Sequence, residues 1–442
     1  MAEAQGRLVS LDVFRGMTIA GMVLVNNPGG SPVYWPLDHA EWNGLTPTDW
    51  IFPFFLFIVG VSISISLGKR IHEKPDAKAY WKIVSRAASI YLLGAAISIV
   101  PFFQFQSTNA PDPLKMLVWL TFCASLFFLL LRNFGIAAVL FVVGLLGIAG
   151  MNLAGYNVVP YDLGTVRIMG VLQRISVCYL VTSLIFLHTN WKQQLGISVA
   201  LLLAYWLIMT EIPVPGCEVA SISDKACNLA AYVDRIVLTE NHIWRYGKVY
   251  DPEGLLSTIP AIVTTISGVL TGTWLRKKSS PPKQEGELEA IDRLNKVSGM
   301  FFFGAILLAI GLIWNSYFPM NKALWTSSYV LATSGLALLV LGSCYWLIDI
   351  KGYRAWAKPF VIFGVNALAL FAFTGFFARM IAAYRIFDAD GKLISVQRAV
   401  INAVFLPIFQ PIDASLAFAI SFILLWLFLM WLLYRKKIYI KV

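Results

Sequence analysis

The sequence predicts an all-α membrane protein, a polytopic bundle of about twelve transmembrane helices. Of its 442 residues, 58% are hydrophobic and only 13% are charged, and the mean hydropathy is +0.71. A soluble protein keeps roughly a quarter of its residues charged, so this chain lacks the material for a surface that faces water on all sides. The expected solvent is therefore the lipid bilayer.

Runs of about 20 mostly apolar residues are long enough to cross the hydrocarbon core as helices. Such runs lie at 9–27, 48–68, 82–101, 114–131, 136–153, 170–188, 194–212, 255–275, 296–316, 325–347, 357–383 and 413–434. Only a few residues separate the fourth run from the fifth. These two form either a tight hairpin or one long helix with a re-entrant piece.

The expected organisation is a single transmembrane domain over residues 1–442. Residues 276–295 are rich in Lys, Ser, Pro and Glu, a composition typical of a solvated, flexible linker. This linker divides the chain into N-terminal helices within 1–275 and C-terminal helices within 296–442.

Most of the 35 Lys and Arg residues fall in loops that share one side of the membrane if the N-terminus is cytoplasmic. The positive-inside rule therefore predicts that both termini are cytoplasmic. The net charge of +11 follows from these loops, and no basic stripe indicates nucleic-acid binding. No cleavable signal peptide is evident, and we expect a multi-pass protein of a bacterial inner membrane.

Charged residues inside membrane helices are costly, so each one is a functional hypothesis by default. Asp12 and Arg15 lie three residues apart on one helix face, which allows either an intrahelical ion pair or a cavity-facing Arg15 that meets a phosphate or carboxylate. Lys69, Arg70 and Arg86 add basic groups at the cytoplasmic end. All four basic residues are candidates for binding an anionic cofactor.

The loop at 28–47 combines helix breakers with an unusual set of polar residues. His39 lies among carboxylates and without a basic neighbour, in a position where an acid or base role is plausible. Asp49 has a structural explanation, because Thr46 can cap the next helix and an acidic residue is favourable in its first turn. The polar residues that accompany His39 as candidate substrate contacts are Asp38, Glu41, Asn43 and Asp49.

Further polar residues lie near the external ends of later helices and suggest a polar cavity that opens outward. They are Gln173, Arg174, Asp234, Asp251, Glu253 and Asn366. The long external loop at 213–254 carries Cys217 and Cys227, ten residues apart on the side that would be oxidising in a bacterial periplasm. We expect a disulfide between them, whereas Cys123, Cys178 and Cys344 lie in apolar helices as packing residues.

Several motifs resemble the heparan-α-glucosaminide N-acetyltransferase family of transmembrane acyltransferases. They are Leu11-Asp12-Val13-Phe14-Arg15-Gly16, Val25-Asn26, His39-Ala40-x-Trp42-Asn43-Gly44-Leu45-Thr46-x-x-Asp49, Gly170-Val171-Leu172-Gln173-Arg174, Tyr232-Val233-Asp234-Arg235, Tyr250-Asp251-Pro252-Glu253-Gly254, Asn321-Lys322-x-Leu324-Trp325-Thr326-x-Ser328-Tyr329-Val330 and Gly364-x-Asn366. They occur in the family's order.

This resemblance implies that acetyl passes from cytosolic acetyl-CoA to the amine of glucosamine or a related amino sugar on the far side. It implies that His39 is the catalytic histidine and that Asn26 accompanies it. Direct attack by the amine in a ternary complex and an acetyl-histidine intermediate are both open at this point. It also implies a homodimer, and no metal is expected. The sequence departs from the lysosomal member because it lacks the large N-terminal luminal domain, so a free or short amino sugar is expected rather than a heparan-type polymer.

Two other functions fit the same composition. A secondary transporter of sugars or organic anions would also have about twelve helices and buried polar groups, although the two halves show no clear internal repeat. An O-acyltransferase that acts on envelope polysaccharide would share the architecture and differ in its acceptor.

Overall fold

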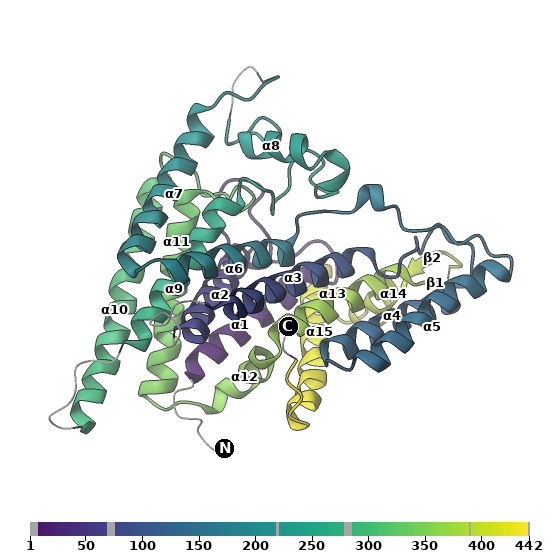
Figure 1. Cartoon of the computed structure of the whole chain (residues 1–442). Coiled ribbons are helices and arrows are strands. Elements are labelled where there is room, and N and C mark those ends of the chain that lie inside the picture. The colour runs from purple at the N-terminus through teal and green to yellow at the C-terminus, as the bar shows by residue number, and fades with distance from the viewer. Residues whose placement is uncertain (1–7, 69–75, 218–220, 278–284, 389, 441–442) are drawn as a thin grey trace. The chain divides into compact units, whose positions relative to one another are not determined.

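The structure is a computed structural model that describes residues 8–68, 76–217, 221–277, 285–388 and 390–440 (Figure 1). Within these residues, 11 helices are long and apolar enough to cross a membrane, or up to 12 if a helix pair broken at Asn366 counts as one span. The strands of the described part are two short ones that pair with each other. These findings confirm the predicted all-α polytopic fold, and the chain is an integral, multi-pass membrane protein.

The long helices follow the hydropathy pattern. They are α1 (Val9–Asn26), α2 (Ile51–Leu67), α3 (Ala77–Ile99), α4 (Asp112–Leu130), α5 (Phe134–Leu153), α6 (Val171–His188), α7 (Trp191–Glu211), α9 (Thr258–Arg276), α10 (Glu285–Trp314), α11 (Ser327–Tyr345), α13 (Ala367–Ala383) and α15 (Pro411–Arg435). Because α4 and α5 are separate helices that pack on each other, the hairpin is the correct alternative for this region.

Shorter elements connect them. They are η1 (Trp35–Leu37), η2 (Pro47–Trp50), η3 (Leu163–Thr165), α8 (Leu229–Val237), η4 (Glu240–His242), the π-helical η5 (Trp346–Ile350), η6 (Ala355–Ala357), α12 (Lys358–Val365), β1 (Arg385–Phe387), β2 (Leu393–Ser395), α14 (Val396–Val400) and the π-helical η7 (Ile401–Phe405).

Residue contacts divide the chain into two compact units. The first contains residues 1–21, 38–91 and 167–365, and the second contains residues 22–37, 92–166 and 366–442. Both units are discontinuous in sequence, and none of the boundaries between them falls within the stretch expected to be a linker.

In the first unit, small residues allow helix backbones to approach each other closely. A Cβ atom added to Gly60 of α2 would lie 1.9 Å from the carbonyl oxygen of Thr265 in α9, and one added to Gly268 would lie 1.9 Å from the carbonyl oxygen of Phe57. Such close approach is typical of helix contacts in membranes, where dispersion rather than the hydrophobic effect drives association. Helices α10 and α11 also pack side by side (Figure 1).

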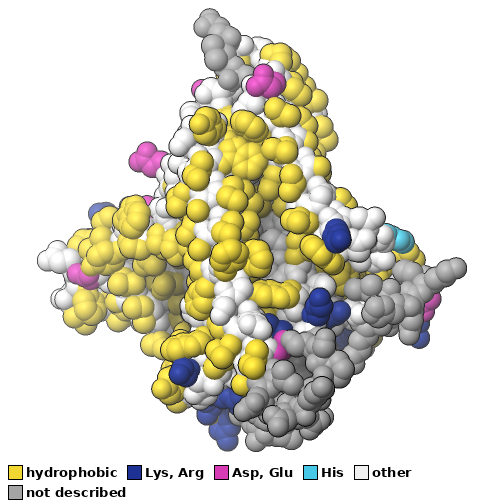
Figure 2. Space-filling model, turned by 90° about the vertical axis from the view of Figure 1, so that its left-hand side faces the viewer, with side chains coloured by type: hydrophobic (Ala, Val, Ile, Leu, Met, Phe, Trp, Pro, Cys, Tyr) yellow, Lys and Arg dark blue, Asp and Glu magenta, His cyan; other side chains and the backbone are white. Residues whose placement is uncertain are grey.

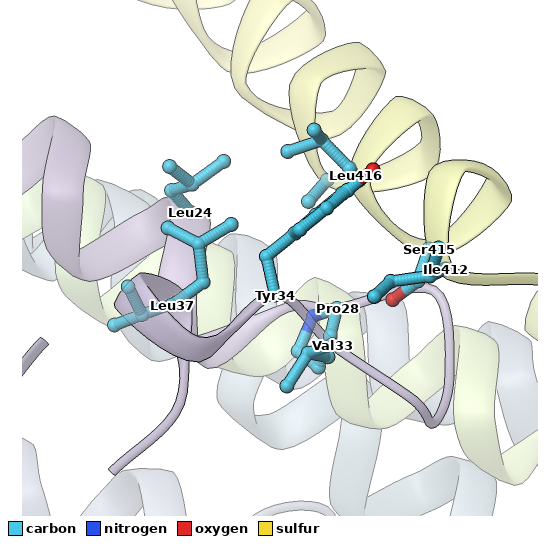
Figure 3. Close-up of a pocket in the computed structure, with 10 residues that line it drawn as sticks. Leu24, Pro28, Val33, Tyr34, Leu37, Ile412, Ser415 and Leu416 are labelled. Atoms are coloured by element: carbon cyan, nitrogen blue, oxygen red, sulfur yellow. The ribbon is translucent and has the colours of Figure 1, made fainter.

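The second unit has its own apolar core, which α4, α5 and α13 share with the segment that follows α3. Its buried members are Val100, Phe103, Phe105, Val118, Trp119, Phe122, Met151, Phe376 and Met380. Elsewhere in this unit, residues that end α1 and follow it pack on the N-terminal part of α15 around a small, mostly apolar pocket. Figure 3 shows Tyr34 lying across this pocket toward Leu416.

Exposed apolar side chains cover the outer helices, as expected where lipid is the solvent. Phe302 and Ile313 of α10 are 59% and 67% exposed, and Val139 and Leu146 of α5 are 62% and 64% exposed. Hydrophobic side chains cover much of the face shown in Figure 2.

Three segments differ from the sequence expectations. Helix α10 begins at Glu285, so residues 285–295 of the expected linker are helical, while 278–284 lie outside the described residues. The run expected to be one helix at 357–383 is broken at Asn366. The external loop at 213–254 contains the short helix α8, whose N-terminus is capped by the Asn228 side chain, which accepts a hydrogen bond from the Ala231 amide.

Candidate functional site

The site begins with a buried carboxylate at the start of α2. Asp49 lies in η2, and its Oδ2 accepts hydrogen bonds from the Thr46 amide at 3.1 Å and the Thr46 hydroxyl at 3.0 Å. It also accepts from the Ala40 amide at 3.2 Å. The capping function expected for Asp49 is therefore present. These bonds fix the carboxylate through Oδ2 and leave Oδ1 available for another partner.

That second oxygen holds His39. Asp49 Oδ1 lies 2.7 Å from His39 Nδ1, and the Asp49 side chain is 1% exposed whereas that of His39 is 47% exposed. A carboxylate accepts only, so Nδ1 carries the proton and Nε2 keeps the lone pair that can take one. This arrangement orients an imidazole as a general base.

A lysine from a distant part of the sequence lies beside this pair. Lys322 Nζ lies 3.0 Å from Nδ1 and 3.2 Å from Nε2 of His39, and 3.6 Å from Asp49 Oδ1. Burial lowers the pKa of Lys322, while the negative charges of Asp49 and Glu253 partly offset this effect.

The loop between α10 and α11 that carries Lys322 is attached to the loop that carries His39. The Gly44 amide donates to the carbonyl oxygen of Met320 at 2.8 Å, and Asn321 Nδ2 donates to Asn43 Oδ1 at 3.1 Å. The Tyr329 hydroxyl donates to the backbone oxygen of Asp49 at 2.6 Å. These bonds fix the two loops relative to each other.

A second group of charges lies in the same compact unit. Arg167 pairs with both Asp251 and Glu253, and its Nε donates to Asp251 Oδ2 at 2.9 Å. Arg174 is fully buried, with Nη2 donating to the carbonyl oxygen of Gly254 at 3.1 Å and its guanidinium over the Trp325 ring.

Burial and pairing set the protonation of this second group. Burial lowers the pKa of the Arg167 guanidinium, but the carboxylates of Glu253 and Asp251 outweigh this effect and raise the pKa above its ordinary value. Glu253 is the reverse case, because Arg167 and Arg174 hold its pKa below the ordinary value despite burial. Burial raises the pKa of Asp234 to about 7, although its carboxylate accepts the Leu255 amide at 2.8 Å.

The loop at 213–254 contacts the His39 loop directly. The Trp42 indole donates to the carbonyl oxygen of Ile222 at 2.9 Å, and Asn43 Nδ2 donates to Ser223 Oγ at 2.9 Å. A disulfide joins Cys217 to Cys227 across this part of the loop. The Trp42 ring also meets the Tyr250 ring edge-on, with centroids 4.9 Å apart, so an aromatic surface flanks the site.

The structure brings several of the predicted site residues together. Asp38 Oδ1 accepts from the His39 amide at 2.9 Å, and Glu41 is exposed on the same loop. Gln173 is buried beside Arg174 in the first turn of α6.

Two predicted residues belong to the second compact unit. Asn26 is the last residue of α1 and is exposed, so its pairing with His39 stays a prediction. Asn366 uses its amide within that unit, where Nδ2 donates to the carbonyl oxygen of Ile438 at 3.1 Å and Oδ1 accepts from the Ile440 amide at 2.8 Å. These bonds attach the segment at 438–440 to Asn366.

The residues predicted to bind the anionic cofactor do not share one set of contacts. Arg15 donates to Asp12 at 3.3 Å and to Ser62 Oγ at 3.0 Å, which gives it the intrahelical pair that the spacing allowed. Arg86 is exposed and lies over the Tyr179 ring. Lys69 and Arg70 lie outside the described residues.

Sequence reasoning did not select Lys322 or Arg167 as site residues. The signal for Lys322 was its place in a family motif, next to Asn321. For Arg167, the only signal was an isolated basic residue on the side expected to be poor in positive charge. Neither signal shows that the residue pairs with carboxylates elsewhere in the chain.

Comparisons with known proteins agree with the motifs. The sequence model of a family described as heparan-alpha-glucosaminide N-acetyltransferase, catalytic, matches residues 7–152. The heparan-alpha-glucosaminide N-acetyltransferase of Homo sapiens is 28% identical over 482 residues, which cover 99% of this chain and 60% of the human protein. That of Mus musculus is 28% identical over 413 residues, which cover 84% of this chain and 53% of the mouse protein. The chain thus spans a little over half the length of these proteins, and it is similar to heparan-alpha-glucosaminide N-acetyltransferases along nearly all of its own length, as its motifs predicted.

Proposed function

We propose that this chain is a membrane N-acetyltransferase that moves an acetyl group from acetyl-CoA to the amine of glucosamine or a related amino sugar. The observation that carries the proposal is the contact between His39 Nδ1 and the buried carboxylate of Asp49 at 2.7 Å. It supplies an oriented base, which an amine needs in order to attack a thioester. The similarity to N-acetyltransferases over 99% of the chain supports the same reaction.

In the proposed reaction, the amine nitrogen of the sugar attacks the thioester carbonyl carbon and forms a C–N bond. His39 Nε2 takes the proton that the amine loses. The C–S bond then breaks, and the departing CoA thiolate receives a proton from the imidazolium. Asn26 is proposed to donate a hydrogen bond to the carbonyl oxygen as it gains negative charge.

The donor is proposed to enter from the cytoplasm, with the CoA phosphates near Lys69, Arg70 and Arg86. Arg15 is a weaker candidate because its guanidinium already binds Asp12 and Ser62. Charge-neutral substitution of all four residues is expected to raise the KM for acetyl-CoA, and an unchanged KM would contradict this assignment. A periplasmic acceptor, a bacterial inner membrane and a homodimer complete the proposal, and they derive from the charge distribution and the resemblance.

The test is single-turnover acetylation of glucosamine by purified, folded protein. His39→Ala is expected to lower the rate by about 10²–10⁴-fold, since that is the usual contribution of a positioned base. His242→Ala is the matched control, because His242 belongs to η4 of the external loop. A His39→Ala protein within threefold of the parent rate would overturn the mechanism.

Two further measurements separate the competing functions. Consumption of the thioester in detergent distinguishes an enzyme from a secondary transporter, which would consume none. Comparison of glucosamine with sugar acceptors that offer only hydroxyl groups distinguishes N-acetylation from O-acetylation.

A further inference from the structure

Lys322 has a position that a simple counter-ion to Asp49 would not require. Its Nζ lies 3.6 Å from Asp49 Oδ1 but 3.0 Å and 3.2 Å from the two ring nitrogens of His39. A direct ammonium–carboxylate pair closes to about 2.7–2.9 Å. The ammonium is therefore centred on the imidazole rather than on the carboxylate.

The backbone on both sides of Lys322 is held in place. Asn321 is fully buried, donates to Asn43, and accepts the Leu324 amide at 2.9 Å through its side chain. Met320 accepts the Gly44 amide on the other side. Because these contacts join the lysine's loop to the loop of His39, the ammonium is positioned before any substrate binds, which is what electrostatic catalysis requires.

This placement has a cost that the reaction itself can offset. When His39 takes a proton, it becomes a cation about 3 Å from a second cation, and two like charges at that separation repel strongly in a partly buried site. The repulsion is relieved if a negative charge develops beside both groups in the same step. Attack on a thioester carbonyl creates such a charge on the carbonyl oxygen.

We propose that Lys322 is a further catalytic residue, whose ammonium donates a hydrogen bond to the acetyl carbonyl oxygen as that oxygen becomes an oxyanion. The inference rests on the proposed function, because it needs His39 as the base and a thioester as the donor. As the amine attacks, the carbonyl π electrons move to the oxygen beside Lys322, and the amine proton moves to His39 Nε2. When the tetrahedral intermediate collapses, the electrons return, the C–S bond breaks, and the thiolate takes the proton from His39.

The test compares Lys322→Ala, Lys322→Met and Lys322→Arg with the parent in single-turnover acetylation. Loss of one oxyanion donor typically costs about 10²–10³ in kcat. We expect a loss of that size for the Ala and Met variants, a smaller loss for Arg, and little change in the KM for glucosamine. Lys248→Ala, which changes an exposed lysine of the external loop, is the control and is expected to keep the parent rate.

A merely structural lysine would give the same loss, so chemical rescue decides the matter. Ethylammonium added to Lys322→Ala is expected to restore a saturable part of the rate, at least tenfold, without affecting His39→Ala. Because ethylamine can itself accept acetyl, the product counted is N-acetylglucosamine alone, by mass spectrometry. A cooperative thermal unfolding transition shows that each variant is folded. If Lys322→Ala does not fold, Lys322→Met replaces it in the rate comparison, because Met keeps the apolar part of the lysine side chain.

Two results would overturn the inference. One is a folded Lys322→Ala or Lys322→Met protein within threefold of the parent. The other is a loss of rate in folded Lys322→Ala that neither ethylammonium nor methylammonium reduces. If the parent protein does not acetylate glucosamine, the proposed function fails. If the parent is active, His39→Ala is inactive and Lys322→Ala is fully active, only the role of Lys322 is overturned.

Discussion

Replacing Asp49 by Asn changes one oxygen of a buried side chain and tests whether the carboxylate controls His39. The bonds from Thr46 and Ala40 all reach Oδ2, and the contact with His39 reaches Oδ1. An amide can keep its oxygen on the three donors of the Oδ2 side. Its NH₂ group then faces His39 Nδ1 and donates a proton instead of accepting one.

The magnitude follows from the tautomer that this donor imposes. With Nδ1 forced to accept, the imidazole proton moves to Nε2, which can no longer act as a base. We expect the acetylation rate of Asp49→Asn to fall by about 10²–10⁴-fold, as large as removal of the base itself. The fold should survive, because three of the four hydrogen bonds are kept and the fourth reverses its direction; even complete loss of that bond would cost only about 1–3 kcal/mol.

Single-turnover acetylation of glucosamine measures the effect, and thermal unfolding in detergent checks the fold. Asp162→Asn is the matched control, since that carboxylate is exposed and accepts a hydrogen bond from the backbone amide of Gly164, outside the candidate site. We expect the control to keep most of the parent rate. A folded Asp49→Asn protein with more than a third of the parent rate would refute the assignment of Asp49 as the orienting group.

Three further predictions concern the loop at 213–254 and the residues that contact it. Gly254→Ala would place its Cβ 1.8 Å from Asp234 Oδ2, so we expect marked destabilisation, seen as a lower apparent Tm; an unchanged Tm would show that Asp234 moves aside easily. Burial raises the pKa of Asp234 to about 7, whereas an unfolded Asp titrates near 4, so its contribution to stability is full below pH 4 and is lost as the pH rises through 7. Parent stability should therefore fall across this range, by up to about 4 kcal/mol, and that of Asp234→Asn should change less; equal pH profiles would contradict the shift. Removing the disulfide with Cys217→Ser and Cys227→Ser should increase the mobility of the segment that binds the His39 loop. We expect this to raise the KM for glucosamine more than it lowers kcat. An unchanged KM would show that this segment has no part in acceptor binding.

The sequence was sufficient to predict the spans because each one must bury about 20 apolar residues in lipid, a strong local signal. It also singled out His39 by its acidic, helix-breaking surroundings. It could not assign Lys322, which lies 283 residues from His39 along the chain and belongs to a different loop. Pairing over that separation depends on tertiary packing, which no local pattern records.

Hydropathy also misplaced some boundaries, for a related reason. A run of apolar residues satisfies a hydropathy window whether or not its helix is continuous. Hydropathy therefore predicted one helix over 357–383, although the helix is broken at Asn366. The break is compensated by tertiary contacts, in which the Asn366 amide satisfies backbone groups at Ile438 and Ile440. At the expected linker, Glu and Lys residues that indicate solvation are also good helix formers, which explains why α10 extends to Glu285.

The charges of the candidate site favour an uncharged amine as the proposed acceptor. Lys322, Arg167 and Arg174 face the carboxylates of Asp49, Asp251 and Glu253, and Asp234 is only about half ionised at pH 7 because burial raises its pKa to about 7. Cations and anions are therefore nearly balanced among these buried and partly buried groups before the reaction starts. A sugar that entered as an ammonium ion would add an unpaired positive charge next to Lys322, which is unfavourable in a partly buried site. Loss of the proton on entry removes that charge and produces the nucleophile that the thioester requires, so the same electrostatic balance that stabilises the folded site favours the reactive form of the acceptor.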